Sequence, residues 1–140
     1  MTVKQKAFSL NQSQKERLMG QLKDILRRYP EVAFAYLYGS FAENLPLHDI
    51  DVGVYLTGIG EKESTSYSLA LSQTLSREVQ VPVDVRVLNF APVSFVYQVI
   101  RGILISDRNE ELRVHVVEET VRKYLDIKPI IHRGIKEAFG

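Results

Sequence analysis

Two acidic residues in a predicted strand have the spacing of a divalent-cation site. In the segment Asp49-Ile50-Asp51-Val52-Gly53-Val54-Tyr55-Leu56, the alternation of side chains along a strand puts Asp49 and Asp51 on one face and the aliphatic residues on the other. Two carboxylates roughly 6.5–7 Å apart on the same face suit a hard cation such as Mg²⁺. An isolated Asp-x-Asp is also typical of a solvated strand face.

A third carboxylate, Asp84, lies in a second predicted strand, where Val83, Val85 and Val87 alternate with Asp84 and Arg86. If the two strands are neighbours in a sheet, Asp84 lies close to the first two carboxylates. Such a trio repels itself unless cations balance its charge, and it is the arrangement that two-metal phosphoryl transfer uses. The alternative is an ordinary polar face with a surface ion pair, which contributes little stability.

The dipeptide Gly39-Ser40 follows the apolar run 32–38 and has the character of a phosphate-binding turn. Glycine lets the backbone approach a ligand closely, and a turn exposes N–H groups that can hold phosphate oxygens. The hydroxyl of Ser40 adds one more donor. Gly-Ser also occurs in plain turns, so this interpretation depends on the carboxylates that follow.

The spacing of apolar residues predicts the elements that must hold these groups. A helix is expected from a cap at Asn11 or Ser13 to Tyr29, and a single helical turn near 41–44. The other predicted elements are strands at 32–38, 49–56, 83–88 and 103–106 and helices at about 64–79, 92–101 and 109–125. This order predicts an α/β (α+β) fold with a mixed sheet of about four strands flanked by helices. We expect one domain over residues 1–140, with its core at about 10–125 and a short C-terminal tail that begins before Pro129.

The composition of the chain is typical of a globular domain and excludes several other classes of protein. The 140 residues are 45% hydrophobic and 25% charged, with a net charge of +1, which are ordinary values for a globular domain. The chain has no cysteine, which excludes a disulfide scaffold and thiol catalysis and fits a reducing, cytoplasmic environment. No apolar run approaches the ~18–20 residues of a membrane span. No Lys/Arg tract is dense enough for a nucleic-acid arm, so neither a membrane nor a nucleic acid is an expected partner.

The combination of these motifs resembles a known family. An apolar strand, Gly39-Ser40, an eight-residue spacer and Asp49-Ile50-Asp51 are similar to the signature of the nucleotidyltransferase superfamily of the DNA polymerase β type. Within it, the chain resembles the minimal nucleotidyltransferase (MNT) proteins most. The motif match is concentrated in residues 37–56, and Val83-Asp84-Val85 is a looser match.

The resemblance implies a role for each candidate residue. Gly39 and Ser40 would bind the phosphates of a nucleotide. Asp49 and Asp51 would bind Mg²⁺, with two ions expected. Asp84 would be the third metal ligand and would activate the acceptor hydroxyl.

The resemblance also implies a partner. MNT proteins often act as antitoxins that transfer AMP from ATP to a tyrosine of a HEPN-domain toxin encoded nearby. We therefore expect a Mg²⁺-dependent protein adenylyltransferase that releases pyrophosphate and whose partner supplies the acceptor. Two alternatives stay open. The chain could be a non-catalytic antitoxin that neutralises its partner by binding, or a small-molecule nucleotidyltransferase of the aminoglycoside-modifying type, which the lack of room for an acceptor domain disfavours.

Overall fold

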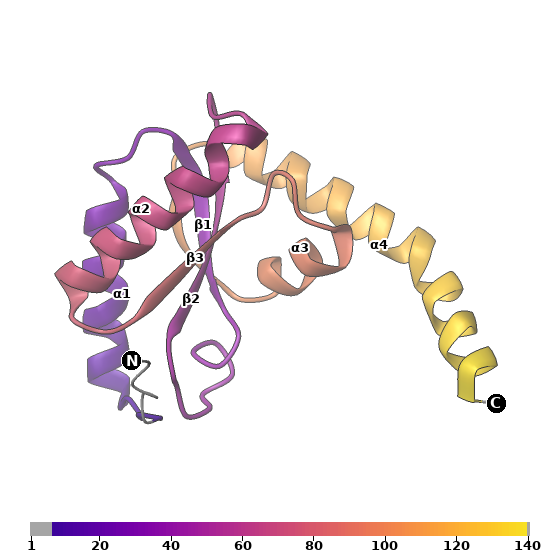
Figure 1. Ribbon diagram of the computed structural model, residues 1–140, viewed down its shortest axis with the longest axis horizontal. Helices are drawn as coiled ribbons and strands as arrows, with labels where there is room; N and C mark the ends of the chain where they lie inside the picture. Colours follow the sequence, from indigo (N-terminus) through magenta and orange to yellow (C-terminus); the bar gives the residue numbers. More distant parts are fainter. Residues whose placement is uncertain (1–6, 140) are drawn as a thin grey trace.

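Four strands and four helices make up the described part of the chain in this computed structural model (Figure 1). The structure describes the backbone of residues 7–139 and the side chains of residues 7–129. The elements in chain order are α1 (Gln12–Leu26), β1 (Val32–Tyr38), β2 (Ile50–Leu56), α2 (Glu61–Val79), β3 (Val83–Val87), α3 (Val93–Ile100), β4 (Ile103–Asp107) and α4 (Glu110–Phe139).

The strands form one mixed sheet in the order β3-β2-β1-β4. The central strand β1 is antiparallel to both of its neighbours, β2 and β4. β2 and β3 are parallel, and α2 is the crossover between them. The predicted mixed sheet of about four strands flanked by helices is therefore confirmed.

Helices cover both faces of the sheet. α1 and α2 lie on one face, and α3 and α4 lie on the other (Figure 1). The main core, under α1 and α2, includes Ile50, Val52, Val54 and Leu56, the alternate residues of β2. A smaller core under α3 and α4 includes Phe34 and Tyr36 of β1 and Val96 and Val99 of α3. Because β1 is covered on both sides, six of its seven residues are buried, as its uninterrupted apolar sequence predicts.

The two helices of the smaller layer are joined by aromatic stacking. The rings of Tyr97 in α3 and Tyr124 in α4 lie parallel, with centroids 3.8 Å apart. Beyond this contact α4 extends away from the sheet (Figure 1). Among the described helices, none is both long enough and apolar enough to span a membrane.

Three helix boundaries predicted from the sequence are wrong. α1 ends at Leu26, not at Tyr29. α2 begins at Glu61, not at Ser64 or Ser66, because acidic residues at 61 and 63 favour the positive end of the helix dipole without a side-chain cap. α4 continues through Pro129 to Phe139. A proline removes the hydrogen bond to the carbonyl four residues earlier. Here that carbonyl belongs to Leu125, a residue that is 57% exposed, on the part of α4 that extends away from the sheet.

Candidate active site

Two predicted site residues, Asp51 and Asp84, form a row across the sheet with Tyr38. In the antiparallel pair Tyr38 lies opposite Asp51, and in the parallel pair Asp51 lies opposite Asp84. Adjacent strands are about 4.8 Å apart, so the row brings both carboxylates and the phenol onto one face within two strand spacings. This is the face that carries α3, because the residues that alternate with Asp51 and Asp84 point into the core under α1 and α2.

Asp49 completes the acidic group. It is partly exposed and comes directly before β2, which begins one residue later than the predicted strand. Burial of the half-buried Asp51 carboxyl and, after it, repulsion from Asp49 and Asp84 together raise its pKa to about 6, against the opposing effect of Arg86. Asp49 and Asp84 are therefore close enough to Asp51 for their charges to repel its carboxylate. A cation beside Asp51 would relieve this repulsion.

The Gly39-Ser40 turn lies directly against Asp51. Gly39 has φ +70°, in the left-handed region, and a Cβ on it would lie 2.8 Å from Oδ2 of Asp51. A side chain here would therefore be strained and would displace the carboxylate. The chain then makes the predicted single turn, in which the Glu43 N–H donates to the Gly39 carbonyl over 3.1 Å and the Leu45 N–H donates to the Ser40 carbonyl over 3.0 Å.

A buried lysine, which the sequence analysis did not select, holds this turn. Lys15 of α1 is only 8% exposed. Its Nζ donates to the carbonyl of Phe41 over 3.2 Å and to Oδ1 of Asn44, and it lies 5.1 Å above the Phe41 ring. Asn44 itself has a positive φ of 58°. Helical spacing could have predicted that Lys15 is buried, since it shares the buried side of α1 with Leu18 and Leu22.

Residues of α3 flank the turn on its other side. The Phe95 ring meets Tyr38 edge-on, with centroids 5.7 Å apart. A hollow of about 200 Å³ separates the turn from the end of α3, and it is lined by Gly39, Glu43, Gln98 and Arg101, among others. Burial is the main cause that raises the pKa of Tyr38, followed by repulsion from Asp51, so this phenol stays protonated and can donate a hydrogen bond.

Asp84 has a basic neighbour on its own strand. Nε of Arg86 donates to Oδ2 of Asp84 over 3.2 Å, and both side chains are substantially exposed. In the described part of the chain, no three or more His, Cys, Asp or Glu side chains are placed to hold one metal ion together. The fit to a hard cation therefore depends on Asp49 and Asp51, two oxygen donors whose mutual repulsion a cation would offset.

The family comparison agrees with this geometry. Residues 20–111 match the model of the family described as "Polymerase beta, Nucleotidyltransferase". The match covers the end of α1, the whole sheet and every site residue predicted from the sequence. The chain therefore belongs to this nucleotidyltransferase family.

Three of the solved structures with a similar fold are chains of toxin–antitoxin structures. A chain of the complex between the tri-AMPylated Shewanella oneidensis HEPN toxin and its MNT antitoxin is 18% identical, with a TM-score of 0.71; the alignment covers 90% of this chain and 99% of that one. A chain of a toxin–antitoxin structure with AMP-PNP is also 18% identical, with a TM-score of 0.72 and coverage of 87% and 98%. A chain of the MntA–HepT toxin–antitoxin complex is 17% identical, with a TM-score of 0.70 and coverage of 89% and 99%. The comparison with curated proteins gives no match.

Proposed function

We propose that this protein is an antitoxin that transfers AMP from ATP to a hydroxyl, with tyrosine the expected acceptor, of a HEPN-domain toxin encoded nearby, and releases pyrophosphate. The reaction would take place in the cytoplasm. The observation that carries the proposal is the row Tyr38–Asp51–Asp84 with Gly39 against the Asp51 carboxylate. The solved complexes with the same fold, one with an AMPylated toxin and one with AMP-PNP, support the choice of nucleotide and partner.

The chemistry divides among the residues of the row. The N–H groups of the Gly39-Ser40 turn and the Ser40 hydroxyl would bind the phosphates, because a tight turn presents such donors together. Asp49 and Asp51 would hold Mg²⁺, with Asp84 as the third carboxylate. When bound, the ions would neutralise charge on the phosphates and on the departing pyrophosphate.

Asp84 is the proposed general base. It lies on the outermost strand of the row, so an acceptor can reach it from outside the sheet. The Asp84 carboxylate would take the proton of the acceptor hydroxyl as its oxygen forms a bond to the α-phosphorus of ATP. The bond from that phosphorus to the bridging oxygen of pyrophosphate breaks in the same displacement. Arg86, hydrogen-bonded to Asp84, would keep the carboxylate oriented.

Intact-mass spectrometry of the partner tests the proposal. The purified HEPN partner is incubated with ATP, Mg²⁺ and the antitoxin, and its mass is compared with that of a sample lacking ATP. We expect the mass to increase by one or more AMP units, and the partner to stay inactive after the antitoxin is removed. A partner of unchanged mass that the antitoxin still neutralises would instead establish neutralisation by contact alone.

A further inference from the structure

The outer edge of β3 is only half covered. The carbonyl of Pro82 and the N–H of Leu88, which flank β3, both bond to β2. Every second residue of a parallel strand bonds to the same neighbour. The backbone groups of Val83, Val85 and Val87 therefore point away from β2, toward the open edge of the sheet.

Hydroxyl groups of α2 bond to the first half of this edge. The Val83 N–H donates to Ser76 Oγ over 2.8 Å, and the Val85 N–H donates to Ser72 Oγ over 2.9 Å. The Ser76 hydroxyl also donates to the Val83 carbonyl over 3.2 Å. An exposed strand edge can pair with another chain, and these serines prevent that at its first two outward positions.

The second half of the edge lacks such partners. Among the described residues, none bonds to the N–H of Val87 or to the outward carbonyls of Val85 and Val87. One turn of α2 before Ser72, the Ser68 hydroxyl donates to Thr65 of its own helix and not to the strand. The serine hydroxyls of α2 therefore bond to Val83 and to the Val85 N–H, and none of them bonds to Val87, the last outward residue of β3.

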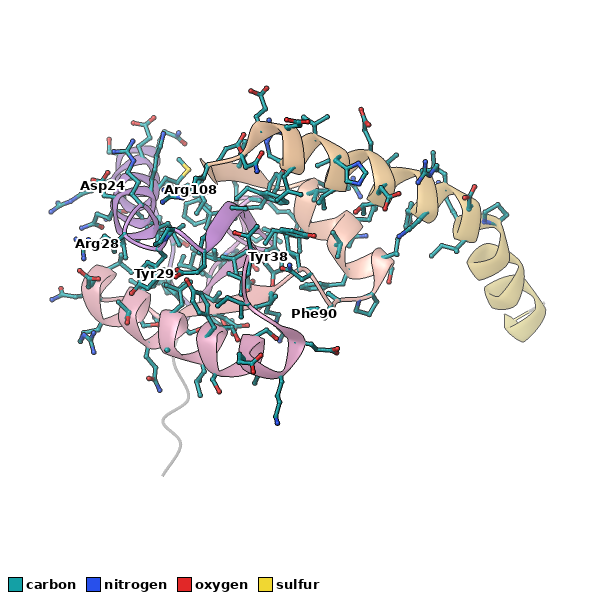
Figure 2. All side chains as sticks on the ribbon, turned by 90° about the horizontal axis from the view of Figure 1, so that it is seen from above. Asp24, Arg28, Tyr29, Tyr38, Phe90 and Arg108 are labelled. Atoms are coloured by element: carbon teal, nitrogen blue, oxygen red, sulfur yellow. The ribbon has the colours of Figure 1, made fainter. Side chains whose placement is uncertain are left out.

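A groove of about 360 Å³ lies along this uncovered stretch. The first turns of α2 form one wall with Ser64, Thr65 and Ser68, and β3 forms the other from Asp84 to Val87. Phe90, which is 46% exposed, closes the far end, and Figure 2 shows it near the first turns of α2. The groove therefore runs from the proposed general base, along unpaired backbone groups, to an exposed aromatic ring.

We propose that an extended segment of the protein acceptor pairs with the outer edge of β3 at Val85–Val87 and places its hydroxyl at Asp84. The inference rests on the proposed function for the identity of the acceptor. Unpaired strand groups provide affinity for any extended peptide, and side-chain pockets beside them provide selectivity. Three residues of extended chain span about 10 Å, so a segment paired at Val87 reaches Asp84 with its neighbouring residues.

The occupant is a peptide and not a small molecule, for a geometric reason. The unsatisfied groups are two carbonyls and one N–H spaced along a strand, which a second strand complements in register. Phe90 gives this peptide an apolar contact at the end away from the catalytic carboxylates. The exposed Arg86 provides a positive charge between the two ends.

The substitution Val87→Pro tests the backbone pairing. Since the Val87 N–H points away from β2, proline removes the outward donor and leaves the ladder to β2 intact, and edge strands tolerate proline. We expect the KM for the partner to rise at least about tenfold, the loss of roughly one good hydrogen bond, with ATP affinity unchanged. Circular dichroism checks that the variant is folded.

A second pair of variants tests the groove without altering β3. Thr65→Trp adds bulk to the groove from α2, whereas Ser66→Trp adds the same bulk on an exposed position of the same helix that does not line it. Thr65→Trp should weaken partner binding at least about tenfold, and Ser66→Trp should not. Wild-type affinity in both Val87→Pro and Thr65→Trp would overturn the inference.

Hydrogen exchange separates this inference from the proposed function. The amide of Val87 should exchange more slowly when the partner is bound, in the absence of ATP and therefore without turnover. Unchanged exchange at Val87 in a formed complex would reject the edge as the binding site, even if AMP transfer occurs. Protection at Val87 in a complex that transfers no AMP would retain the binding site and reject the proposed enzyme activity.

Discussion

Asp51 in β2 lies directly opposite Asp84 in β3, although all of α2 separates them in the chain. The parallel crossover is what makes this possible, since it brings the start of β3 beside the start of β2. Their side chains then lie on the same face, with the Gly39 turn in contact with Asp51 from the next strand. The arrangement concentrates negative charge at the point where a phosphate must bind, so a cation is required for the chemistry that we propose.

Removing either carboxylate of the Asp49/Asp51 pair should abolish most transfer. Asp49→Asn and Asp51→Asn keep side-chain shape but remove a charge that would bind Mg²⁺. We expect each variant to lose at least about 10²-fold in the rate of AMP transfer, the scale of losing one electrostatic stabiliser. Single-turnover assays with the partner measure the rate. Full activity in either variant would contradict the metal site.

The raised pKa of Asp51 predicts a pH-dependent stability. The folded protein holds this proton with a pKa of about 6, against an ordinary value of 3.8. Because the folded state binds the proton more tightly than the unfolded chain, the contribution of Asp51 favours folding at about pH 4 and below. This contribution is lost as the pH rises through about 6.

Asp51→Asn should therefore be more stable than the wild type above pH 6. The carboxyl is half-exposed, so we discount the free-energy difference for solvent screening to about 1 kcal/mol. The two proteins should converge as the pH falls toward about 4. Chemical denaturation in the presence of a chelator, across this pH range, measures the difference. A variant less stable than the wild type at neutral pH would show that the Asp51 charge is not destabilising.

Substitution of Gly39 should damage the site more than substitution of Ser40. In Gly39→Val, a β-branched side chain would have to adopt a φ of +70° and displace the Asp51 carboxylate. The left-handed backbone alone costs about 1–2 kcal/mol. Ser40→Ala removes one hydroxyl and should cost on the order of 1 kcal/mol of ATP affinity. Calorimetric titration with ATP and Mg²⁺ should rank the affinities as wild type, Ser40→Ala, Gly39→Val, and equal affinities would indicate a merely structural turn.

Much of the fold could be predicted because the apolar pattern is locally unambiguous. The sequence of β1 is an unbroken apolar run because helices cover both of its faces. In β2, apolar residues alternate with others, because one face packs in the main core and the opposite face carries Asp51 of the site. The pairing of Asp51 with Asp84 could not be derived from either strand alone. It depends on which strands become neighbours, a property of the whole sheet.

Other parts of the site could not be predicted because they depend on tertiary contacts. The hydrogen bonds of Lys15 join α1 to a turn that is distant in sequence, and its charge suggested a solvent-exposed position. α4 passes through Pro129 on an exposed part of the helix, and the local sequence, in which proline favours a helix end, does not predict this. In both cases the decisive factor is the tertiary environment and not the local sequence.

Loss of the Lys15 ammonium should loosen the phosphate turn. Lys15→Met keeps the buried aliphatic chain but leaves the Phe41 carbonyl and the Asn44 side chain without their donor, at a cost of about 1–3 kcal/mol in unfolding free energy. The KM for ATP should rise while the affinity for the partner is retained. Lys23→Met, on an exposed position of the same helix, is the matched control and should change neither quantity. An unchanged KM for ATP in Lys15→Met would show that the turn keeps its shape unaided.

Replacement of Asp84 should separate nucleotide binding from transfer. Asp84→Asn retains Gly39, Ser40 and the Asp49/Asp51 pair, so ATP should bind with near wild-type affinity. The variant lacks the carboxylate that would accept the proton of the attacking hydroxyl, and the loss of a general base costs typically about 10²–10⁴-fold in rate.

Co-expression of the partner with Asp84→Asn, followed by intact-mass spectrometry, measures the remaining transfer. Arg86→Gln serves as the matched control, because it removes the hydrogen-bond partner of Asp84 while leaving the carboxylate in place. We expect Arg86→Gln to retain more transfer than Asp84→Asn. If Asp84→Asn modifies the partner as fully as the wild type does, proton removal must occur elsewhere. Asp84 would then serve the binding of the partner and not the chemical step.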